Sequence, residues 1–279
     1  MPGYRLMGIV NVTPDSFSDG GLFLEAGAAV AHGLDLVEQG AHVLDIGGES
    51  TRPGAQPVAV GEELRRVVPV IEGLAGAIGS TPGPIGPLAQ ISVDTSKAAV
   101  ARAALDAGAS LVNDVTALRG DPEMAGVVAA GGADCCLMHM LGSPRTMQRD
   151  PRYEDVVDEV KSFLQERLAF AVREGIEERR VLLDPGIGFG KTVDHNLALL
   201  RRLDELVALG RPIVIGTSRK SFLGGDAAGR LPGTIATNVM AFERGASVFR
   251  VHDVAPVAGA LAVAAATLSG KWTSTGTTS

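Results

Sequence analysis

The feature that most constrains the fold is a regular alternation of short, β-branched runs with longer helical patterns along the 279 residues. Continuous apolar runs are typical of parallel strands covered on both faces, and parallel strands need helical crossovers between them. Eight such runs predict an α/β protein whose single domain is a (β/α)8 barrel, also called a TIM barrel. The expected strands are LMGIVNV, HVLDIGG, ISVDT, SLVNDV, CCLMHM, VLLDPG, PIVIGTS and VFRVHD.

Helices are expected between these runs, and several of the helical patterns close on the glycine that often follows a helix end. The main alternative is a doubly wound open sheet, but its G-x-G-x-x-G fingerprint is absent after the first run, which leads into TPDSFSDGG. We therefore expect the barrel over residues 1–271 and a disordered C-terminal tail over residues 272–279. Expected helices cover residues 26–40, 61–76, 97–108, 155–175 and 194–210.

Composition excludes several classes of partner. The net charge of −7 argues against sequence-independent binding of nucleic acid, which requires clustered positive charge. The alanine-rich stretch 255–268 is shorter than the roughly 20 apolar residues of a membrane span, so no membrane partner is expected. Cys135 and Cys136 are adjacent, so they should point to opposite faces of a strand and stay unpaired. This pattern fits a reducing cytoplasm.

Each expected strand stops in a hydrogen-bonding side chain. A lone Asp or Asn in such a place more often caps a helix or closes a turn. Eight together predict one polar pocket, because the carboxyl ends of barrel strands meet at a single face. The strand-end residues are Asn11, Asp45, Asp94, Asn113, Asp114, Met138, His139, Asp184, Ser218, Arg219, Lys220, Ser221, Arg250 and His252.

The pocket divides into two chemical sets. Asp94, Asn113 and Asp184, with Lys220, suit a flat, nitrogen-rich heterocycle that carries an exocyclic amine and a carbonyl. The cationic set of Arg52, Arg250 and His252 suits a phosphate or diphosphate. Asn11 offers a hard oxygen ligand for Mg²⁺. The five histidines show no zinc spacing.

Less specific explanations exist for two of these residues. Met138 is more often packing than chemistry, and Lys220 could be a solvated loop cation. The position of Lys220 directly after the apolar run PIVIG favours a role in the site.

Taken together, these motifs resemble those of the bacterial dihydropteroate synthase family of pterin-binding barrels. The resemblance runs in order from about Met7 to Val254. It rests on MGIVNVTPDSFSDGG, DIGGESTRPGA, ISVDTSK, NDV, LMHM, LDPGIGFGK, GTSRKSF and RVHDV.

The resemblance implies a transferase of folate biosynthesis, which condenses hydroxymethyl-dihydropterin pyrophosphate with p-aminobenzoate to give dihydropteroate and pyrophosphate. It also implies Mg²⁺ as cofactor, a homodimer and inhibition by sulfonamides. The catalytic residues would be Lys220, Asp94, Asp184 and Asp15, the last on the first loop.

By motif, the resemblance also assigns the binding roles. The pterin would lie against Asp94, Asn113, Met138, Asp184 and Lys220, and Asn11 would bind the metal. Pyrophosphate would be held by Thr51, Arg52, Arg250 and His252. The p-aminobenzoate pocket would be shaped by Phe17, Pro53, Phe189 and Ser221.

Two other functions remain open from the sequence. A methyltetrahydrofolate-binding methyltransferase domain shares the fold and the pterin site but has no use for a diphosphate cluster, so SRKSF and RVHDV count against it. A non-catalytic pterin-binding protein would be expected to lack loop residues, whereas TPDSFSDGG and STRPGA are both intact.

Overall fold

Eight parallel strands form the centre of the molecule, and each pairs in register with its neighbours in the order β6-β5-β4-β3-β2-β1-β8-β7. The computed structural model describes residues 3–12, 21–51, 54–79, 89–226 and 229–271. β7 meets β6 through the bridge between Leu183 and Ile213, so the sheet closes on itself. The predicted (β/α)8 barrel is confirmed. The strands are β1 (Arg5–Asn11), β2 (Val43–Gly47), β3 (Gln90–Asp94), β4 (Leu111–Asp114), β5 (Asp134–Met138), β6 (Val181–Asp184), β7 (Val214–Ile215) and β8 (Val248–Val251).

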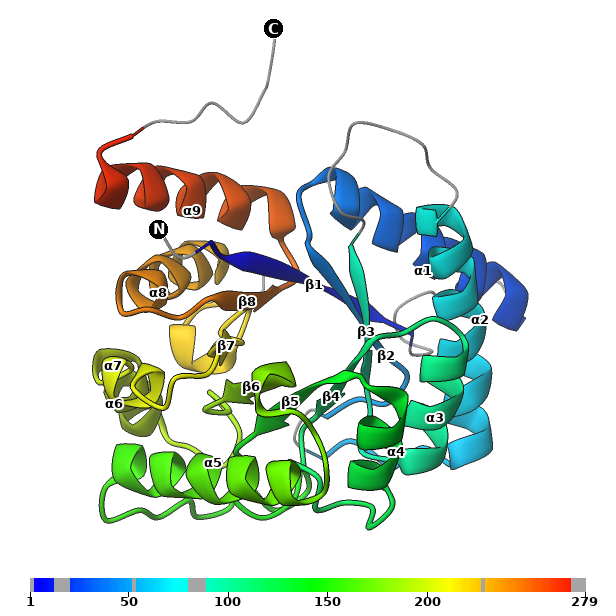
Figure 1. The fold of residues 1–279 in the computed structure, drawn as a ribbon. Coiled ribbons are helices and arrows are strands. Elements are labelled where there is room, and N and C mark those ends of the chain that lie inside the picture. Colours follow the sequence, from blue (N-terminus) through cyan, green and yellow to red (C-terminus); the bar gives the residue numbers. More distant parts are fainter. Residues whose placement is uncertain (1–2, 13–20, 52–53, 80–88, 227–228, 272–279) are drawn as a thin grey trace, which may run out of the picture.

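The helices lie outside the strands, with α1 to α4 on the right of Figure 1 and α6 to α9 on the left. Four of the five expected helices are present as single helices, with ends shifted by a few residues. The helices are α1 (Gly21–Glu38), α2 (Val60–Gly79), α3 (Ala98–Asp106), α4 (Met124–Gly131), α5 (Val156–Arg173), α6 (Val193–Arg201), α7 (Asp204–Val207), α8 (Leu231–Glu243) and α9 (Val254–Ser269), with the 3-10 turns η1 (Glu178–Arg180) and η2 (Ser221–Leu223).

One expected helix is wrong in its extent, because residues 194–210 form two helices, α6 and α7. Arg202 leaves helical geometry at the end of α6, with φ −107° and ψ 29°. Its guanidinium binds the carboxylates of Asp155 and Glu205, each at 2.6 Å. The ion pair with Asp155, the N-cap of α5, ties the break to a neighbouring helix, which the local periodicity does not reveal.

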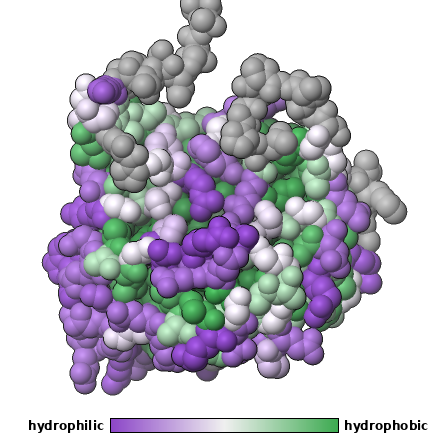
Figure 2. All heavy atoms as spheres, in the orientation of Figure 1, coloured by the Kyte–Doolittle hydropathy of each residue, from purple (hydrophilic) through white to green (hydrophobic). Residues whose placement is uncertain are grey.

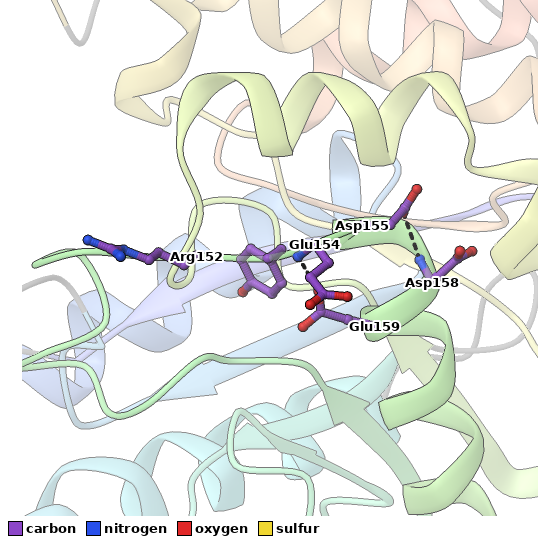
Figure 3. Close-up of a pocket in the computed structure, with 6 residues that line it drawn as sticks. Arg152, Glu154, Asp155, Asp158 and Glu159 are labelled. Carbon is purple, nitrogen blue, oxygen red and sulfur yellow. Dashed lines mark hydrogen bonds between the residues drawn. The ribbon is translucent and has the colours of Figure 1, made fainter.

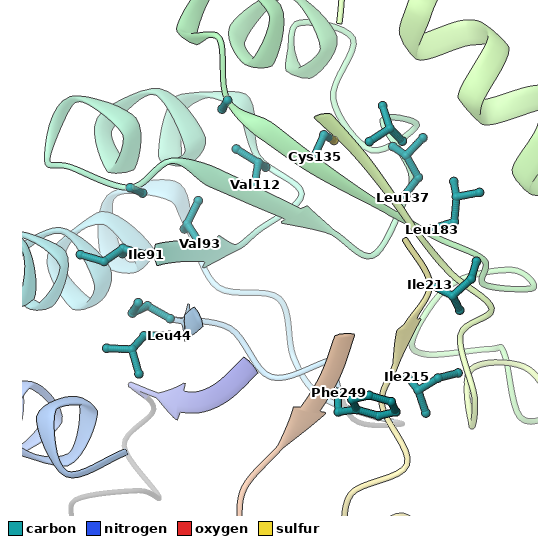
Figure 4. Close-up of a cluster of buried hydrophobic side chains, with 14 of the residues drawn as sticks. Leu44, Ile91, Val93, Val112, Cys135, Leu137, Leu183, Ile213, Ile215 and Phe249 are labelled. Carbon is teal, nitrogen blue, oxygen red and sulfur yellow. The ribbon is translucent and has the colours of Figure 1, made fainter. Parts of the chain in front are cut away.

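Alternate residues of each strand face two separate cores, as the pleat of a strand requires. The outer core packs strand residues such as Leu44, Val112, Leu183 and Phe249 against the helices (Figure 4). The inner core lies inside the barrel and takes one residue from each of seven strands, namely Met7, Val43, Leu111, Cys136, Leu182, Val214 and Val248.

This alternation also settles the cysteine prediction. Cys135 belongs to the outer core and Cys136 to the inner core, and both are buried, free thiols. The residue two positions after an inner-core residue faces the same interior, one layer nearer the carboxyl end. Asp45, Asn113, Asp184 and Arg250 stand in that layer.

On the face shown in Figure 2, hydrophilic side chains gather at the lower left, over the region of α5 to α7. No helix in the described part of the chain is long and apolar enough to cross a membrane.

Candidate active site

Asp45 is the centre of a buried polar network at the carboxyl ends of the strands. Its side chain is fully buried, and its carboxylate accepts hydrogen bonds from Ser92 Oγ at 2.6 Å, Asn113 Nδ2 at 3.0 Å and Arg250 Nε at 2.6 Å. These donors come from β3, β4 and β8. A buried carboxylate is tolerated only when donors satisfy it, and three donors do so here.

Asp94 shares the guanidinium of Arg250 with Asp45. Arg250 Nη2 donates to Asp94 Oδ2 at 2.8 Å, and only 8% of Asp94 is exposed. Burial raises the pKa of Asp94 to about 7, although the charge of Arg250 acts in the opposite direction. Arg250 was predicted from the sequence to contact pyrophosphate. Its guanidinium instead binds two carboxylates, Asp45 and Asp94, of which Asp94 was expected to face the heterocycle.

Asp184 and Lys220 form the opposite part of the site, at the ends of β6 and β7. Asp184 Oδ1 accepts from the backbone N–H of Gly186 at 2.6 Å. Burial raises the pKa of Asp184, against the charge of Lys220. Burial likewise lowers the pKa of Lys220 to about 8, against the charge of Asp184. The two charged groups therefore stabilise each other's ionised form across the site.

Phe189 lies over Lys220, with the ammonium 4.5 Å from the ring centroid. The chain reaches this position through a tight turn in which Gly186, Gly188 and Gly190 all have positive φ. At Gly186 a Cβ would lie 1.8 Å from the carbonyl oxygen of His139, so the backbones of two neighbouring strand ends are too close for any other residue. The glycines of GIGFG thus bring an aromatic ring next to the cation.

The predicted anion-binding residues are distributed around the same face. His252 Nδ1 lies 3.0 Å from Ser218 Oγ, which joins the ends of β8 and β7. Thr51 follows β2 and Ser221 begins η2 directly after Lys220. Arg52, Pro53, Asp15 and Phe17 lie outside the described residues.

The loop after β2 is anchored at its start. Lys97 forms ion pairs with Glu49 in this loop and with Glu63 of α2, whose side chain is fully buried. Arg66 Nη1 donates to the carbonyl of Gly48 at 2.8 Å. These contacts fix the backbone immediately before Thr51.

Asn11 ends β1 opposite Gly47 of β2, and its side chain is partly exposed. Within the described ranges, no three His, Cys, Asp or Glu side chains are grouped closely enough to hold a metal ion. One amide oxygen fits Mg²⁺ when water and substrate phosphate complete its shell, which is the usual arrangement for this ion. The donor set therefore suits a metal that arrives with a phosphorylated ligand.

A shallow surface depression of about 550 Å³ lies at the start of α5 (Figure 3). It is lined by Arg152, Tyr153, Glu154, Asp155, Asp158 and Glu159. Its carboxylates are engaged locally, because Asp155 caps α5 and Glu159 accepts from the backbone of Glu154. The depression lacks the convergent strand-end groups described above, so we do not assign it a role in the chemistry.

Two features of the site were missed by the sequence reasoning. Asp45 was recognised as a strand-end residue but was given no role, although it orients Asn113 and Arg250. Lys191 and His139 form a buried pair, with Nζ to Nδ1 at 2.8 Å; both lie in recognised motifs, but neither was given a role. The available signal was the alternation of inward-facing positions, which places Asp45 on the same face as Val43.

Comparison with known proteins agrees with this geometry. Residues 7–252 match the model of a family described as pterin binding enzyme. The dihydropteroate synthase of Escherichia coli (strain K12) is 44% identical over 271 residues, which is 96% of this chain and 93% of the relative.

Solved structures give the same result. A Xanthomonas albilineans dihydropteroate synthase with 4-aminobenzoic acid superposes with a TM-score of 0.87 at 49% identity, covering 95% of this chain and 93% of that one. A Yersinia pestis dihydropteroate synthase with a sulfonamide drug complex has a TM-score of 0.87 at 43% identity, covering 96% and 95%.

Fold, strand-end site and relatives together define a pterin-binding barrel enzyme. The chain belongs to the dihydropteroate synthase family, as its motifs predicted, and is a transferase of folate biosynthesis. This assignment favours the expected reaction over a methyltransferase domain or a non-catalytic pterin-binding protein.

Proposed function

We propose that this chain joins hydroxymethyl-dihydropterin pyrophosphate to p-aminobenzoate, releasing pyrophosphate and forming dihydropteroate. The observation that carries the proposal is the convergence of buried Asp94, Asn113 and Asp184 with Lys220 at the strand ends of a family member. The relatives named dihydropteroate synthase, one of them bound to 4-aminobenzoic acid, support it.

The pterin is bound by the acceptors and donors of the inner layer. Asp184 and Asp94 accept from ring and exocyclic N–H groups, and Lys220 donates to the carbonyl side of the ring. Asn113 uses one N–H to reach Asp45, which leaves its carbonyl oxygen to accept from the pterin. Met138, which is buried at the end of β5, packs against the ring.

The diphosphate is bound by Thr51, Arg52, Arg250 and His252. Arg250 lies between Asp45 and Asp94 and donates to both. It therefore links the bound anion to Asp94, one of the carboxylates that bind the pterin. Asn11 would hold Mg²⁺, and the bound ion would supply positive charge to the diphosphate oxygens.

The p-aminobenzoate is bound between Phe17, Pro53, Phe189 and Ser221. The ring of Phe189 and the adjacent Lys220 support this position, because an aromatic face beside a cation suits a flat anionic aromatic.

The reaction is a displacement at the pterin methylene carbon. The aniline nitrogen forms the new C–N bond, the C–O bond to pyrophosphate breaks with its electron pair, and the nitrogen loses a proton. Asp94 and Asp184, with Asp15 from the first loop, stabilise the positive charge that develops on the pterin as the leaving group departs. The protein needs to supply no nucleophile.

The proposed function is tested with the purified chain and synthetic substrates. We expect dihydropteroate and pyrophosphate to form in equal amounts when both substrates and Mg²⁺ are present, and neither to form when any one is omitted. Pyrophosphate release without p-aminobenzoate would instead indicate a hydrolase.

Sulfonamides reproduce the aniline and the anionic end of p-aminobenzoate, and a sulfonamide drug occupies the Yersinia pestis relative. Rejecting them would require an added steric element, and none is visible in TPDSFSDGG or STRPGAQP. We expect a sulfonamide to raise the apparent KM for p-aminobenzoate at unchanged kcat in a steady-state assay. An unchanged KM at large excess would contradict this.

We further propose that residues 1–271 are one domain, that the enzyme works in the cytoplasm and that it is a homodimer. Two free, buried thiols support a reducing compartment. Exposed Val193 and Leu197 on α6, with Met240 on α8, support a subunit contact. Light scattering on the purified chain measures the oligomeric state.

A further inference from the structure

Four consecutive carbonyl groups in the loop after β6 each accept a hydrogen bond from a side chain. Lys220 Nζ donates to Ile187, Gln148 Nε2 to Gly188 at 2.7 Å, Lys191 Nζ to Phe189 at 3.1 Å and Tyr153 Oη to Gly190 at 2.8 Å. Gln148 and Tyr153 lie between β5 and α5, Lys220 follows β7, and Lys191 is the residue directly after Gly190. A loop rich in glycine is therefore held at every peptide from Ile187 to Gly190.

The bond at Phe189 has a particular consequence. The Phe189 backbone N–H donates to the carbonyl of Gly186 at 3.0 Å, and its own carbonyl accepts from Lys191. Hydrogen bonds on both sides of the Cα fix its φ and ψ angles, and these angles set the direction of the Cβ. The position of the ring over Lys220 thus depends on Lys191.

Lys191 is itself held in the interior. Only 3% of the residue is exposed, and its ammonium also donates to Nδ1 of His139, which is 6% exposed and follows the end of β5. Burial and the charges of Lys191 and Arg119 lower the pKa of His139, so the imidazole is neutral and can accept. The Phe163 ring packs nearly perpendicular to the imidazole, with the two ring centroids 4.8 Å apart.

The charged groups around Lys191 do not give it another partner. Burial lowers the pKa of Lys191 to about 7, and Asp184 and Lys220 act on it only at longer range, the first favouring and the second opposing its charge. Among the described residues, its ammonium hydrogen-bonds to the side chain of His139 and to the backbone carbonyl of Phe189. Burying an amine that makes only these two hydrogen bonds costs stability, so the pair is explained better by the groups it holds in place than by a gain in folding free energy.

We propose that Lys191, seated on His139, is a positioning residue for the p-aminobenzoate pocket: it fixes the backbone of Phe189 and thereby the ring that contacts the second substrate. This inference rests on the proposed function, which assigns Phe189 to that pocket. It assigns Lys191 no contact with either substrate.

The test compares Lys191→Met with the exposed control Lys271→Met in steady-state assays of both substrates. Methionine keeps the length and volume of the stem but removes the donors. We expect Lys191→Met to raise KM for p-aminobenzoate tenfold or more, while kcat and KM for the pterin diphosphate change less than threefold. Lys271→Met should match the unchanged chain.

Variants of His139 provide a second, independent test of the same inference. His139→Leu removes the acceptor and should reproduce the p-aminobenzoate defect, whereas His139→Asn keeps an acceptor near the Nδ1 position and should restore most of the affinity. Circular dichroism and thermal unfolding establish that each variant is folded.

Each outcome decides the inference. An unchanged KM for p-aminobenzoate in folded Lys191→Met or His139→Leu would overturn it, as would an equal rise in both KM values. Failure of both variants to fold would also overturn it, because the Lys191–His139 pair would then stabilise the barrel as a whole and not position the Phe189 ring. If the unchanged chain makes no dihydropteroate, the proposed function fails instead, so the two failures are distinct.

Discussion

At the scale of single residues, the site is defined by buried charges that are held by specific partners. Lys220 illustrates this: its ammonium donates to the carbonyl of Ile187, lies over Phe189 and balances Asp184. These contacts belong to the site and not to the hydrophobic cores, so its removal should affect binding and chemistry more than folding.

We expect Lys220→Ala to lower kcat/KM for the pterin diphosphate by about two to three orders of magnitude, because a charge-assisted donor that strengthens in the transition state is lost. The melting temperature should stay within a few degrees of that of the unchanged chain. Lys271→Ala serves as the surface control. A variant with near-native turnover would remove Lys220 from the proposed mechanism.

Lys220 also predicts a pH dependence. Burial lowers the pKa of Lys220 to about 8, so its charged, donating form is present below that pH and is lost above it. Because kcat/KM reports the free enzyme, it should fall about tenfold per pH unit above pH 8. In Lys220→Arg the residual activity should lack this alkaline decline, because arginine stays charged. A decline in the variant at the same pH would assign it to another group.

At the scale of elements, the loop after β6 depends on the absence of side chains at its glycines. Gly186 has φ +67°, and a Cβ there would meet the carbonyl oxygen of His139 at 1.8 Å. Gly132, at the end of α4, has a similar φ of +57° but nothing within 4 Å of a Cβ. Substituting Gly132 therefore measures backbone strain alone, whereas substituting Gly186 measures backbone strain together with steric overlap.

Gly132→Ala should cost about 1 kcal/mol of unfolding free energy, the usual penalty for an L-residue in the left-handed region. Gly186→Ala carries the same penalty plus a backbone collision, so it should cost at least about 3 kcal/mol and displace Phe189 and Asp184. Urea unfolding measures both values. Equal losses in the two variants would show that the loop moves aside without cost.

The elements were also the scale at which the sequence was most informative. Each βα unit carries its own period and its own strand-end residue, so Asp94, Asn113 and Asp184 could be placed at one face without any structure. The break between α6 and α7 could not, because the contact that accompanies it joins Arg202 to Asp155, 47 positions earlier. Lys191 and His139 are likewise 52 positions apart, and neither flanking pattern indicates that they meet.

At the scale of the whole molecule, Asp45 connects four strands. Its hydrogen bonds reach β3, β4 and β8, so one carboxylate holds together both the inner layer of the barrel and the residues proposed to bind substrate. Stability and function therefore share this network.

Asp45→Asn should lower the free energy of unfolding by about 3 kcal/mol, the low end for breaking a buried ion pair, because Arg250 keeps partial access to water. Asp35→Asn, on an exposed position of α1, should change it by less than about 0.5 kcal/mol. Chemical denaturation of both variants provides the comparison. A loss at Asp45 no larger than at Asp35 would show that the network is structurally dispensable.

The ion pairs of Arg250 also determine when the enzyme becomes complete during translation. Arg250 lies 205 positions after Asp45 and 156 after Asp94, so both carboxylates leave the ribosome well before their common partner is made. Until β8 enters the sheet, they must remain hydrated or take up protons, because a buried, unpaired carboxylate is costly. Pairing with Arg250 therefore couples closure of the nascent barrel to the first appearance of a charged, ordered pterin site, and a chain stopped before β8 can have neither.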